Sequence, residues 1–361
     1  MIETFTIIFG FVAFISTLKE IKNKHLIFWL FTLLLIFFDG LRWEMGVDWL
    51  TYHKIFMTAD VYKFQGFEPG YLFYQSIIRK FTDNYSVFLL ITTAFIYLTI
   101  YYTVFKITNY SFISLFYLTA TIPWYSGSLR NMIAASFFTL AIKAIFDKKM
   151  LKFLFFIITG ILFHTSLIAF LPIYWIYNFS LILYLLIFIV LSVGSIYSSY
   201  LIETLDQIVK FYGYNRSYSR YVGGNILHSN PLLGFTRKLI TITGLLSFTF
   251  LATKFKNKEI VPWDKIKFIF FISSLSIIFY YIGTYQITNV SSRLDIYAGI
   301  IGTSILIGFI DKLYSRRNNK IFLFLFVTFL VCVFYYRLEH MSLFHPYSSI
   351  FYNFDYKRNL F

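Results

Sequence analysis

Three side chains in this sequence can take a proton from a hydroxyl group: Asp48, Glu68 and His164. Carboxylates and neutral imidazoles are common general bases in enzymes. Asp48 and Glu68 lie in the first stretch where charge becomes dense, residues 39–71 (DGLRWEMGVDWLTYHKIFMTADVYKFQGFEPGY), and charged residues alternate there with Trp and Tyr. Aromatic rings with mixed charge suit a carbohydrate site or a membrane-surface site, and an interfacial loop with an aromatic belt has the same composition.

Each of these two carboxylates also has a structural explanation. Asp48 lies four residues before Tyr52, so both side chains share one face if this stretch is helical. Asp48 can act there as a base, or it can form a local salt bridge with Arg42. Glu68 precedes Pro69, and an acidic residue beside a helix N-terminus with Pro at the first helical position is ordinary capping chemistry.

Two arginines lie where apolar runs begin. Arg130 follows a Gly-Ser turn and opens an apolar helix, and Arg293 lies in the pattern Asn289-x3-Arg293-x3-Tyr297. An arginine at membrane depth needs an anionic partner. A phosphate group held by arginine and a helix N-terminus satisfies this need, as does contact with lipid headgroups.

His164 interrupts an apolar run, ILFHTSLIAF. A lone buried histidine is usually a hydrogen-bonded core residue, but its intramembrane position favours a functional role. HExxH, CxxC, DxD, Walker and GxGxxG motifs are missing from the sequence. Metal or nucleotide chemistry therefore has no support, and we expect no metal and no cofactor.

The composition predicts an all-α polytopic membrane protein. Of the 361 residues, 58% are hydrophobic and 14% are charged, and apolar runs of about 17–25 residues, the length of a membrane-spanning helix, recur along the chain. The net charge of +15 comes mostly from Lys and Arg in short loops. The positive-inside rule explains this excess better than nucleic-acid binding does. The single cysteine, Cys332, cannot form an internal disulfide.

The basic loops set the expected topology. We expect one transmembrane domain over 1–361 with about 10–12 spans, and extracytoplasmic loops at 41–84 and 200–238. Residues 71–81 are too short to span and are expected to lie in the interface or to dip into the membrane. Residues 153–199 are expected to contain a broken or re-entrant segment, interrupted at His164 and Pro172. The expected spans are 2–18, 26–40, 85–105, 111–126, 132–146, 239–253, 268–287, 294–310 and 321–336.

This topology places the candidate functional polar residues on the external side of the membrane. A reaction is therefore expected on that side or in a cavity open to it. The residues are Arg42, Asp48, Glu68, Arg130, Arg216, Arg220, Arg237, Arg293, His340 and His345. The cytoplasmic side carries little besides Lys and Arg.

Five motifs occur in a specific order: RWEMGVDWLTY with EPGY, LRNMIA, FHTS, NVSSRLDIY and a C-terminal Pro346-Tyr347. In this order they resemble the EpsG-like branch of the Wzy-type polysaccharide polymerases, from about residue 2 to 350. The resemblance implies a GT-C-like architecture and a glycosyltransferase that acts without a metal. Such enzymes join undecaprenyl-pyrophosphate-linked repeat units of O-antigen, capsule or exopolysaccharide at the outer face of the bacterial inner membrane.

The resemblance also implies roles for residues. Asp48 is the first choice for the base, followed by Glu68 and His164. The expected substrate-binding residues are Arg42, Tyr52, Tyr71, Arg130, Arg293 and Tyr297, together with Arg216 and Arg220 for a second pyrophosphate or the growing chain. The implied partners are the lipid-linked donor and acceptor, membrane lipid and a chain-length regulator protein. A lipid-linked glycan ligase or single-sugar GT-C glycosyltransferase is the first alternative, and a lipid-linked oligosaccharide flippase is the second.

The topology can be tested by cysteine labelling in a Cys332→Ser background. Cysteines placed in 41–70, in 200–236 and in the C-terminal tail are expected to react with a membrane-impermeant reagent applied from outside, because the basic loops lie opposite. Protection of the 200–236 loop in intact spheroplasts would contradict this topology and remove Arg216 and Arg220 from the site.

Overall fold

The computed structural model describes residues 2–17, 23–46, 48–58, 67–125, 127–196, 261–285, 293–314, 320–340 and 347–351. Over these residues the chain is helical, and its only β-type pairing is an isolated bridge between Arg42 and Ser349. The predicted all-α fold is confirmed. Loop 200–238 and the expected span at 239–253, with Arg216 and Arg220, lie outside the described residues.

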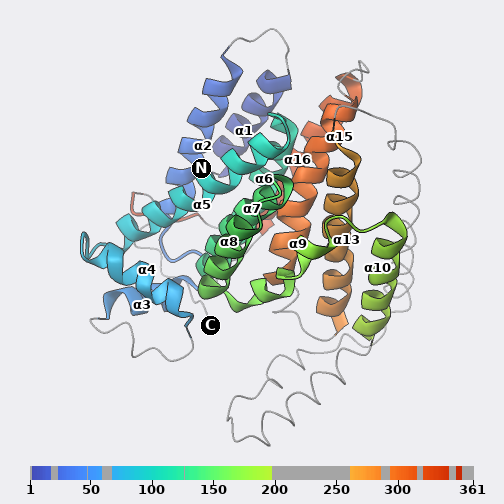
Figure 1. Cartoon of the computed structure of the whole chain (residues 1–361). Coiled ribbons are helices and arrows are strands. Elements are labelled where there is room, and N and C mark those ends of the chain that lie inside the picture. The colour runs from blue at the N-terminus through green and yellow to red at the C-terminus, as the bar shows by residue number, and fades with distance from the viewer. Residues whose placement is uncertain are drawn as a thin grey trace, which may run out of the picture. The chain divides into compact units, whose positions relative to one another are not determined.

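The described elements follow the order in Figure 1. They are α1 (Ile2–Thr17), α2 (Lys24–Gly40), α3 (Trp49–Met57), α4 (Pro69–Arg79), α5 (Tyr85–Ile107), α6 (Phe112–Thr121), the 3-10 helix η2 (Ile122–Tyr125), α7 (Leu129–Phe146), α8 (Met150–Phe163), the 3-10 helix η3 (Thr165–Phe170), α9 (Ile173–Ile176), α10 (Leu181–Ile196), α13 (Trp263–Tyr285), the π-helix η5 (Ile296–Gly302), α15 (Thr303–Tyr314) and α16 (Lys320–His340).

Within the described ranges, three helices are long and apolar enough to cross a membrane: Tyr85–Ile107, Leu129–Phe146 and Arg293–Lys312. Shorter apolar helices accompany them, including His25–Gly40 and Met150–Phe163. The chain is therefore a polytopic membrane protein. The total of about 10–12 spans stays a prediction.

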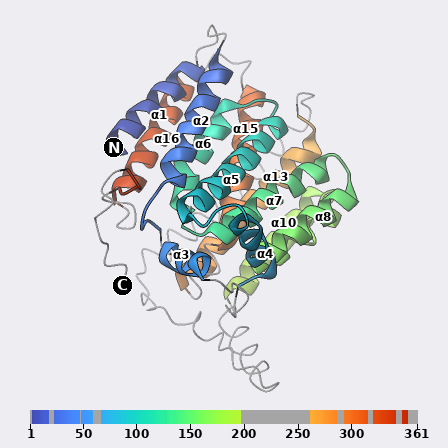
Figure 2. The same cartoon turned by 90° about the vertical axis from the view of Figure 1, so that its left-hand side faces the viewer.

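The chain divides into two compact units, Met1–Leu171 with Ile307–Phe361, and Pro172–Leu306. In the first unit, α5 packs against α2 and α7, α7 packs against α8, and α1 packs against α2 and α16 (Figure 2). Most of α7 is buried, and it forms the centre of this unit.

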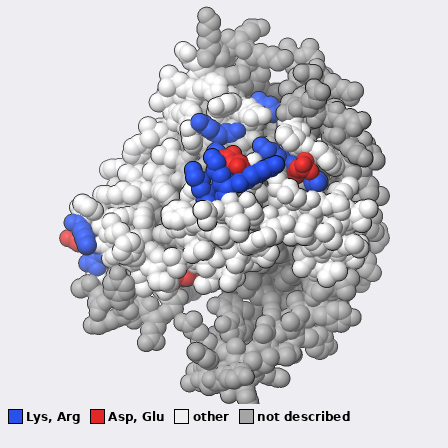
Figure 3. All heavy atoms as spheres, viewed as in Figure 1, with Lys and Arg blue, Asp and Glu red and all other residues white. Residues whose placement is uncertain are grey.

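The outward surface of the first unit suits a bilayer. On α8, exposed apolar side chains recur every three or four residues, at Leu151, Phe155, Ile158 and Leu162. This spacing places them on one stripe of the helix. On the face drawn in Figure 3, the charged side chains gather in a few groups surrounded by uncharged residues.

The interruption predicted at His164 and Pro172 within 153–199 is confirmed. Helix α8 ends at Phe163, and the chain continues through His164 into a 3-10 helix and then past Pro172 into the short helix α9. Helix α10 starts only at Leu181. The break leaves backbone groups at His164 outside a regular helix, where side chains can bind them.

Helices α3 and α4 lie together near the N-terminal end of α5 (Figures 1 and 2). Helix α3 has only nine residues, too few to be stable alone, and it buries Trp49, Tyr52, Ile55 and Phe56. The Arg79 guanidinium at the end of α4 donates to the backbone carbonyl of Thr58, which follows α3. Most of the segment 71–81, predicted to be too short to span, belongs to the 11-residue helix α4.

The second unit contains α10, α13 and the π-helix. The Tyr184 ring of α10 stacks on Phe271 of α13 with centroids 4.8 Å apart. The Ser276 hydroxyl donates to Asp295 Oδ1 at 2.6 Å and so ties α13 to the start of the π-helix. An intramembrane carboxylate is thus held by a hydroxyl donor.

The chain segment 347–351 fastens the loop after α2 in the first unit. Tyr347 stacks on Phe38 with centroids 4.4 Å apart, and its hydroxyl donates to the Phe38 carbonyl at 2.7 Å. The Trp43 backbone N–H donates to the Ser348 carbonyl at 3.0 Å. In the same loop, Arg42 is buried and pairs with Asp39 at 2.7 Å.

Truncation of Tyr347 tests this fastening. Tyr347→Ala is expected to lower the free energy of unfolding by about 3–5 kcal/mol, the usual cost of deleting a large buried aromatic ring. Tyr347→Phe removes only the hydroxyl bond and should cost about 1 kcal/mol. Phe351→Ala, in the same segment but 81% exposed, is the control. Thermal unfolding midpoints in detergent should follow this order, and equal midpoints for Tyr347→Ala and Phe351→Ala would contradict it.

Candidate functional site

Arg130 lies at the second residue of α7, after η2 and a tight turn. Gly46, at φ +100°, lies against that turn, and a Cβ added to Gly46 would approach the Gly127 Cα to 2.7 Å. Only glycine allows this close approach with a positive φ. The loop that contains the RWEMGVDW motif therefore packs directly against the turn before Arg130.

The Arg130 guanidinium contacts three side chains from two other segments. Its Nη1 forms an ion pair with Glu68 Oε2, and its Nε donates to the Tyr52 hydroxyl at 3.4 Å. Its central carbon lies 4.2 Å from the centre of the Phe67 ring, a cation–π contact. The Arg130 and Glu68 side chains are 14% and 12% exposed, so the pair is mostly shielded yet accessible.

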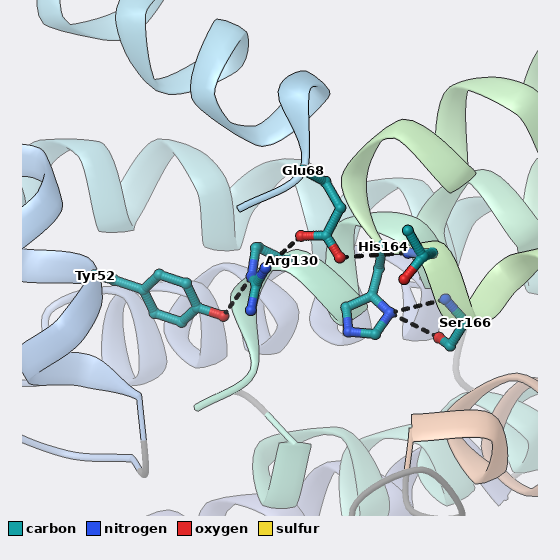
Figure 4. Close-up of polar contacts among 6 residues, drawn as sticks. Tyr52, Glu68, Arg130, His164 and Ser166 are labelled. Carbon is teal, nitrogen blue, oxygen red and sulfur yellow. Dashed lines mark hydrogen bonds and ion pairs between the residues drawn. The ribbon is translucent and has the colours of Figure 1, made fainter. Parts of the chain in front are cut away.

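Glu68 connects Arg130 to the break after α8. It precedes α4, and its Oε1 accepts a hydrogen bond from the Thr165 backbone N–H at 3.4 Å. Gly70 makes this approach possible, because a Cβ at that position would lie 2.7 Å from the Leu162 carbonyl oxygen. Figure 4 shows Glu68 between Arg130 and the turn that begins at His164.

His164 is buried and caps the 3-10 helix that follows it. Its Nδ1 accepts from the Ser166 backbone N–H at 3.3 Å and lies 2.7 Å from the Ser166 hydroxyl (Figure 4). An Nδ1 that accepts these bonds leaves the proton of the neutral ring on Nε2. His164 therefore caps the 3-10 helix through Nδ1 and carries a hydrogen-bond donor at Nε2.

Tyr52 lies on α3 with Asp48 one turn before it. Burial raises the pKa of the Tyr52 phenol above its ordinary value of 10, the nearby Arg130 lowers it and the Asp48 carboxylate raises it. Tyr52 therefore stays protonated and can donate its hydroxyl proton while it accepts from Arg130. The backbone carbonyl of Asp48 accepts a hydrogen bond from the Tyr52 N–H at 3.0 Å. Asp48 and Tyr52 are therefore one helical turn apart, as the sequence spacing predicted.

The structure thus brings together Tyr52, Glu68, Arg130 and the turn at His164, which come from four separate segments of the sequence. The arrangement offers a fixed positive charge beside the N-terminus of a long helix, with a carboxylate next to it. Such a site can hold a phosphate-bearing group and take up a proton.

The other expected site residues have different surroundings. Arg42 and Tyr71 are buried, with 2% and 0% of their surface exposed. Arg293 and Tyr297 belong to the second unit, where Arg293 precedes the π-helix and Tyr297 is fully buried within it.

Sequence reasoning missed Phe67 and the Thr165 backbone N–H as parts of this site. Both adjoin residues that the sequence singled out, since Phe67 precedes Glu68 and Thr165 follows His164. The partner of Arg42, Asp39, was also missed, although its i, i+3 spacing is a local signal.

A comparison with protein-family models matches residues 25–349 to the EpsG family, a family of Wzy-like polysaccharide polymerases. The chain therefore belongs to the EpsG family, as the order of its motifs indicated. Neither the curated proteins nor the solved structures contain a match to this chain.

The capping geometry of His164 gives a test of its role. His164→Ala is expected to lower the free energy of unfolding by about 0.5–2 kcal/mol, because the Ser166 N–H loses its cap. His164→Asn should keep most of the stability, since the Asn oxygen can replace Nδ1, whereas His164→Gln offers its oxygen one bond further out. Thermal unfolding in detergent measures the relative stabilities of these variants. A His164→Asn variant as unstable as His164→Ala would rule out the capping role.

Proposed function

We propose that this member of the EpsG family joins lipid-linked oligosaccharide repeat units into a polysaccharide at the outer face of the bacterial inner membrane. The single observation that carries the proposal is the meeting of the Arg130 cation, the N-terminus of α7 and the Glu68 carboxylate. Membership of the EpsG family supports a glycosyltransferase activity for this chain. The product would be an O-antigen, a capsule or an exopolysaccharide.

The proposed sugar donor carries its glycan on undecaprenyl pyrophosphate. Its diphosphate is an anion at the membrane surface, and Arg130 offers a planar guanidinium that can bind two oxygens at once. The helix N-terminus beside Arg130 adds partial positive charge and backbone N–H donors. These residues would stabilise the charge that develops on the leaving diphosphate.

The acceptor hydroxyl comes from a second lipid-linked unit and must lose a proton during the transfer. Of the three candidate bases, Glu68 is the one that forms an ion pair with Arg130. It can therefore reach a hydroxyl placed beside the diphosphate. His164 is a weaker candidate for this role, because its Nδ1 already accepts from Ser166. Asp48 stays a second candidate through its place beside Tyr52.

The buried residues have a supporting role in this proposal. Arg42 holds the loop after α2 through Asp39 and does not need to touch substrate. Tyr71 packs against the Tyr52 ring with centroids 5.4 Å apart, which fixes the Tyr52 hydroxyl next to Arg130. Arg293 is proposed to bind a further phosphate, on the strength of its place at the start of a membrane helix.

Substitution of Arg130 tests the function. Purified protein in proteoliposomes, supplied with a lipid-linked repeat unit, should form a ladder of products. Arg130→Ala is expected to lower the rate at least about 100-fold, the scale for loss of one transition-state donor. Arg130→Lys should recover only part, because lysine lacks the planar fork.

The exposed residue Lys80, at the end of α4, gives the matched control, and Lys80→Ala should keep the wild-type rate. Arg293→Ala is expected to lose activity as Arg130→Ala does. A fully active Arg130→Ala variant would make Arg130 a headgroup anchor and contradict the proposal. A single addition without a ladder would favour the ligase, and transport without bond formation would favour the flippase.

A further inference from the structure

We propose that Glu68 and the diphosphate of the sugar donor compete for Arg130, so that binding of the donor releases Glu68 to act as the base. The inference rests on the proposed function and adds the order of events and a mechanism for it. In the structure Arg130 is neutralised by Glu68, and this ion pair is the starting point of the proposed exchange.

Both oxygens of Glu68 are engaged in this state. Oε2 is paired with Arg130, and Oε1 accepts from the Thr165 N–H. A general base must form a hydrogen bond to the hydroxyl whose proton it takes, and the oxygens of Glu68 already bind Arg130 and the Thr165 N–H. Glu68 therefore cannot serve as a base until one of its partners leaves.

The diphosphate is the stronger competitor for Arg130. It carries more negative charge than one carboxylate and offers several oxygens to the guanidinium, and it also gains the N–H donors at the start of α7. The guanidinium need not move far, because the Phe67 ring 4.2 Å below it and the Tyr52 hydroxyl hold it in place while its anionic partner changes. The exchange thus replaces one anion by another on a fixed cation.

The released carboxylate stays at the site. The Thr165 N–H still holds Oε1, and the contact of Gly70 with Leu162 keeps the start of α4 against α8. Only Oε2 is freed, next to the diphosphate that displaced it. This is the position that a base needs, because the acceptor hydroxyl must approach the carbon that bears the diphosphate.

The transfer then balances. The acceptor oxygen forms a bond to the anomeric carbon, and the bond from that carbon to the diphosphate oxygen breaks. The hydroxyl proton moves to Glu68 Oε2, and the electron pair leaves with the diphosphate, which Arg130 holds. When the lipid diphosphate departs, Glu68 gives up its proton to water and pairs with Arg130 again.

The exchange predicts opposite effects of one substitution on binding and on turnover. Glu68→Gln removes the charge that competes for Arg130, so farnesyl diphosphate should bind about tenfold more tightly, the change expected when a charged hydrogen-bond partner becomes neutral. The same variant should lose at least about 100-fold in ladder formation, because glutamine cannot accept the proton. Binding is measured by calorimetry on the full-length protein in detergent, with farnesol as the ligand that lacks phosphate.

Two further variants serve as controls for this experiment. Asp83→Asn makes the same change of charge at an exposed residue between α4 and α5, and it should alter neither quantity. Arg130→Ala should lose binding of farnesyl diphosphate. Unchanged or weaker binding by Glu68→Gln, or a wild-type rate of ladder formation, would overturn the exchange.

A measurement on the wild-type protein covers the case in which Glu68→Gln does not fold. Modification of Glu68 by a carbodiimide, followed by peptide mass, should increase when inorganic pyrophosphate is bound, because the carboxylate is released. Lower modification would overturn the exchange. If the wild type forms no ladder but Glu68→Gln binds more tightly, the proposed function fails and the exchange stands. If the wild type forms a ladder and Glu68→Gln does not bind farnesyl diphosphate more tightly, the exchange fails and the proposed function stands.

Discussion

The structure of the first unit depends on one electrostatic constraint, the permanent positive charge of Arg130 at the start of a buried membrane helix. A guanidinium cannot lose its charge in a protein, so a shielded arginine must be paired with an anion. Glu68 supplies that anion from a residue 62 positions earlier in the chain. The short helices α3 and α4, which cannot be stable alone, are arranged around this pair.

Close backbone contacts make the pairing possible. Gly46 lies on the turn before Arg130, and Gly70 lies on the end of α8, each at a distance that a Cβ would not allow. The segment 347–351 closes the loop between α2 and α3 from the other end of the chain. Membrane helices thus provide a rigid base for a polar site that is itself built from loops and helix ends, which is how a site can be held to the geometry that chemistry needs.

This arrangement suits the proposed substrate, which is half lipid and half sugar. The outward faces of the helices are apolar, as on α8, where a lipid tail can lie. The charged groups of the site gather at helix ends, where a phosphate would sit at the membrane surface. The polar half of such a substrate then meets aromatic rings and a carboxylate, and membership of the EpsG family fits this division.

The sequence alone determined the all-α polytopic class, the break at His164 and the family, because the length of apolar runs and the order of short motifs are local properties of the chain. It also drew attention to Glu68, Arg130 and His164, since charged residues in apolar surroundings are conspicuous. Reasoning from the sequence ranked Asp48 first as the base, followed by Glu68 and His164. Only the tertiary structure decided that Glu68 is the carboxylate on Arg130, because that contact is set by the packing of α4 against α8, and no spacing within the sequence encodes it.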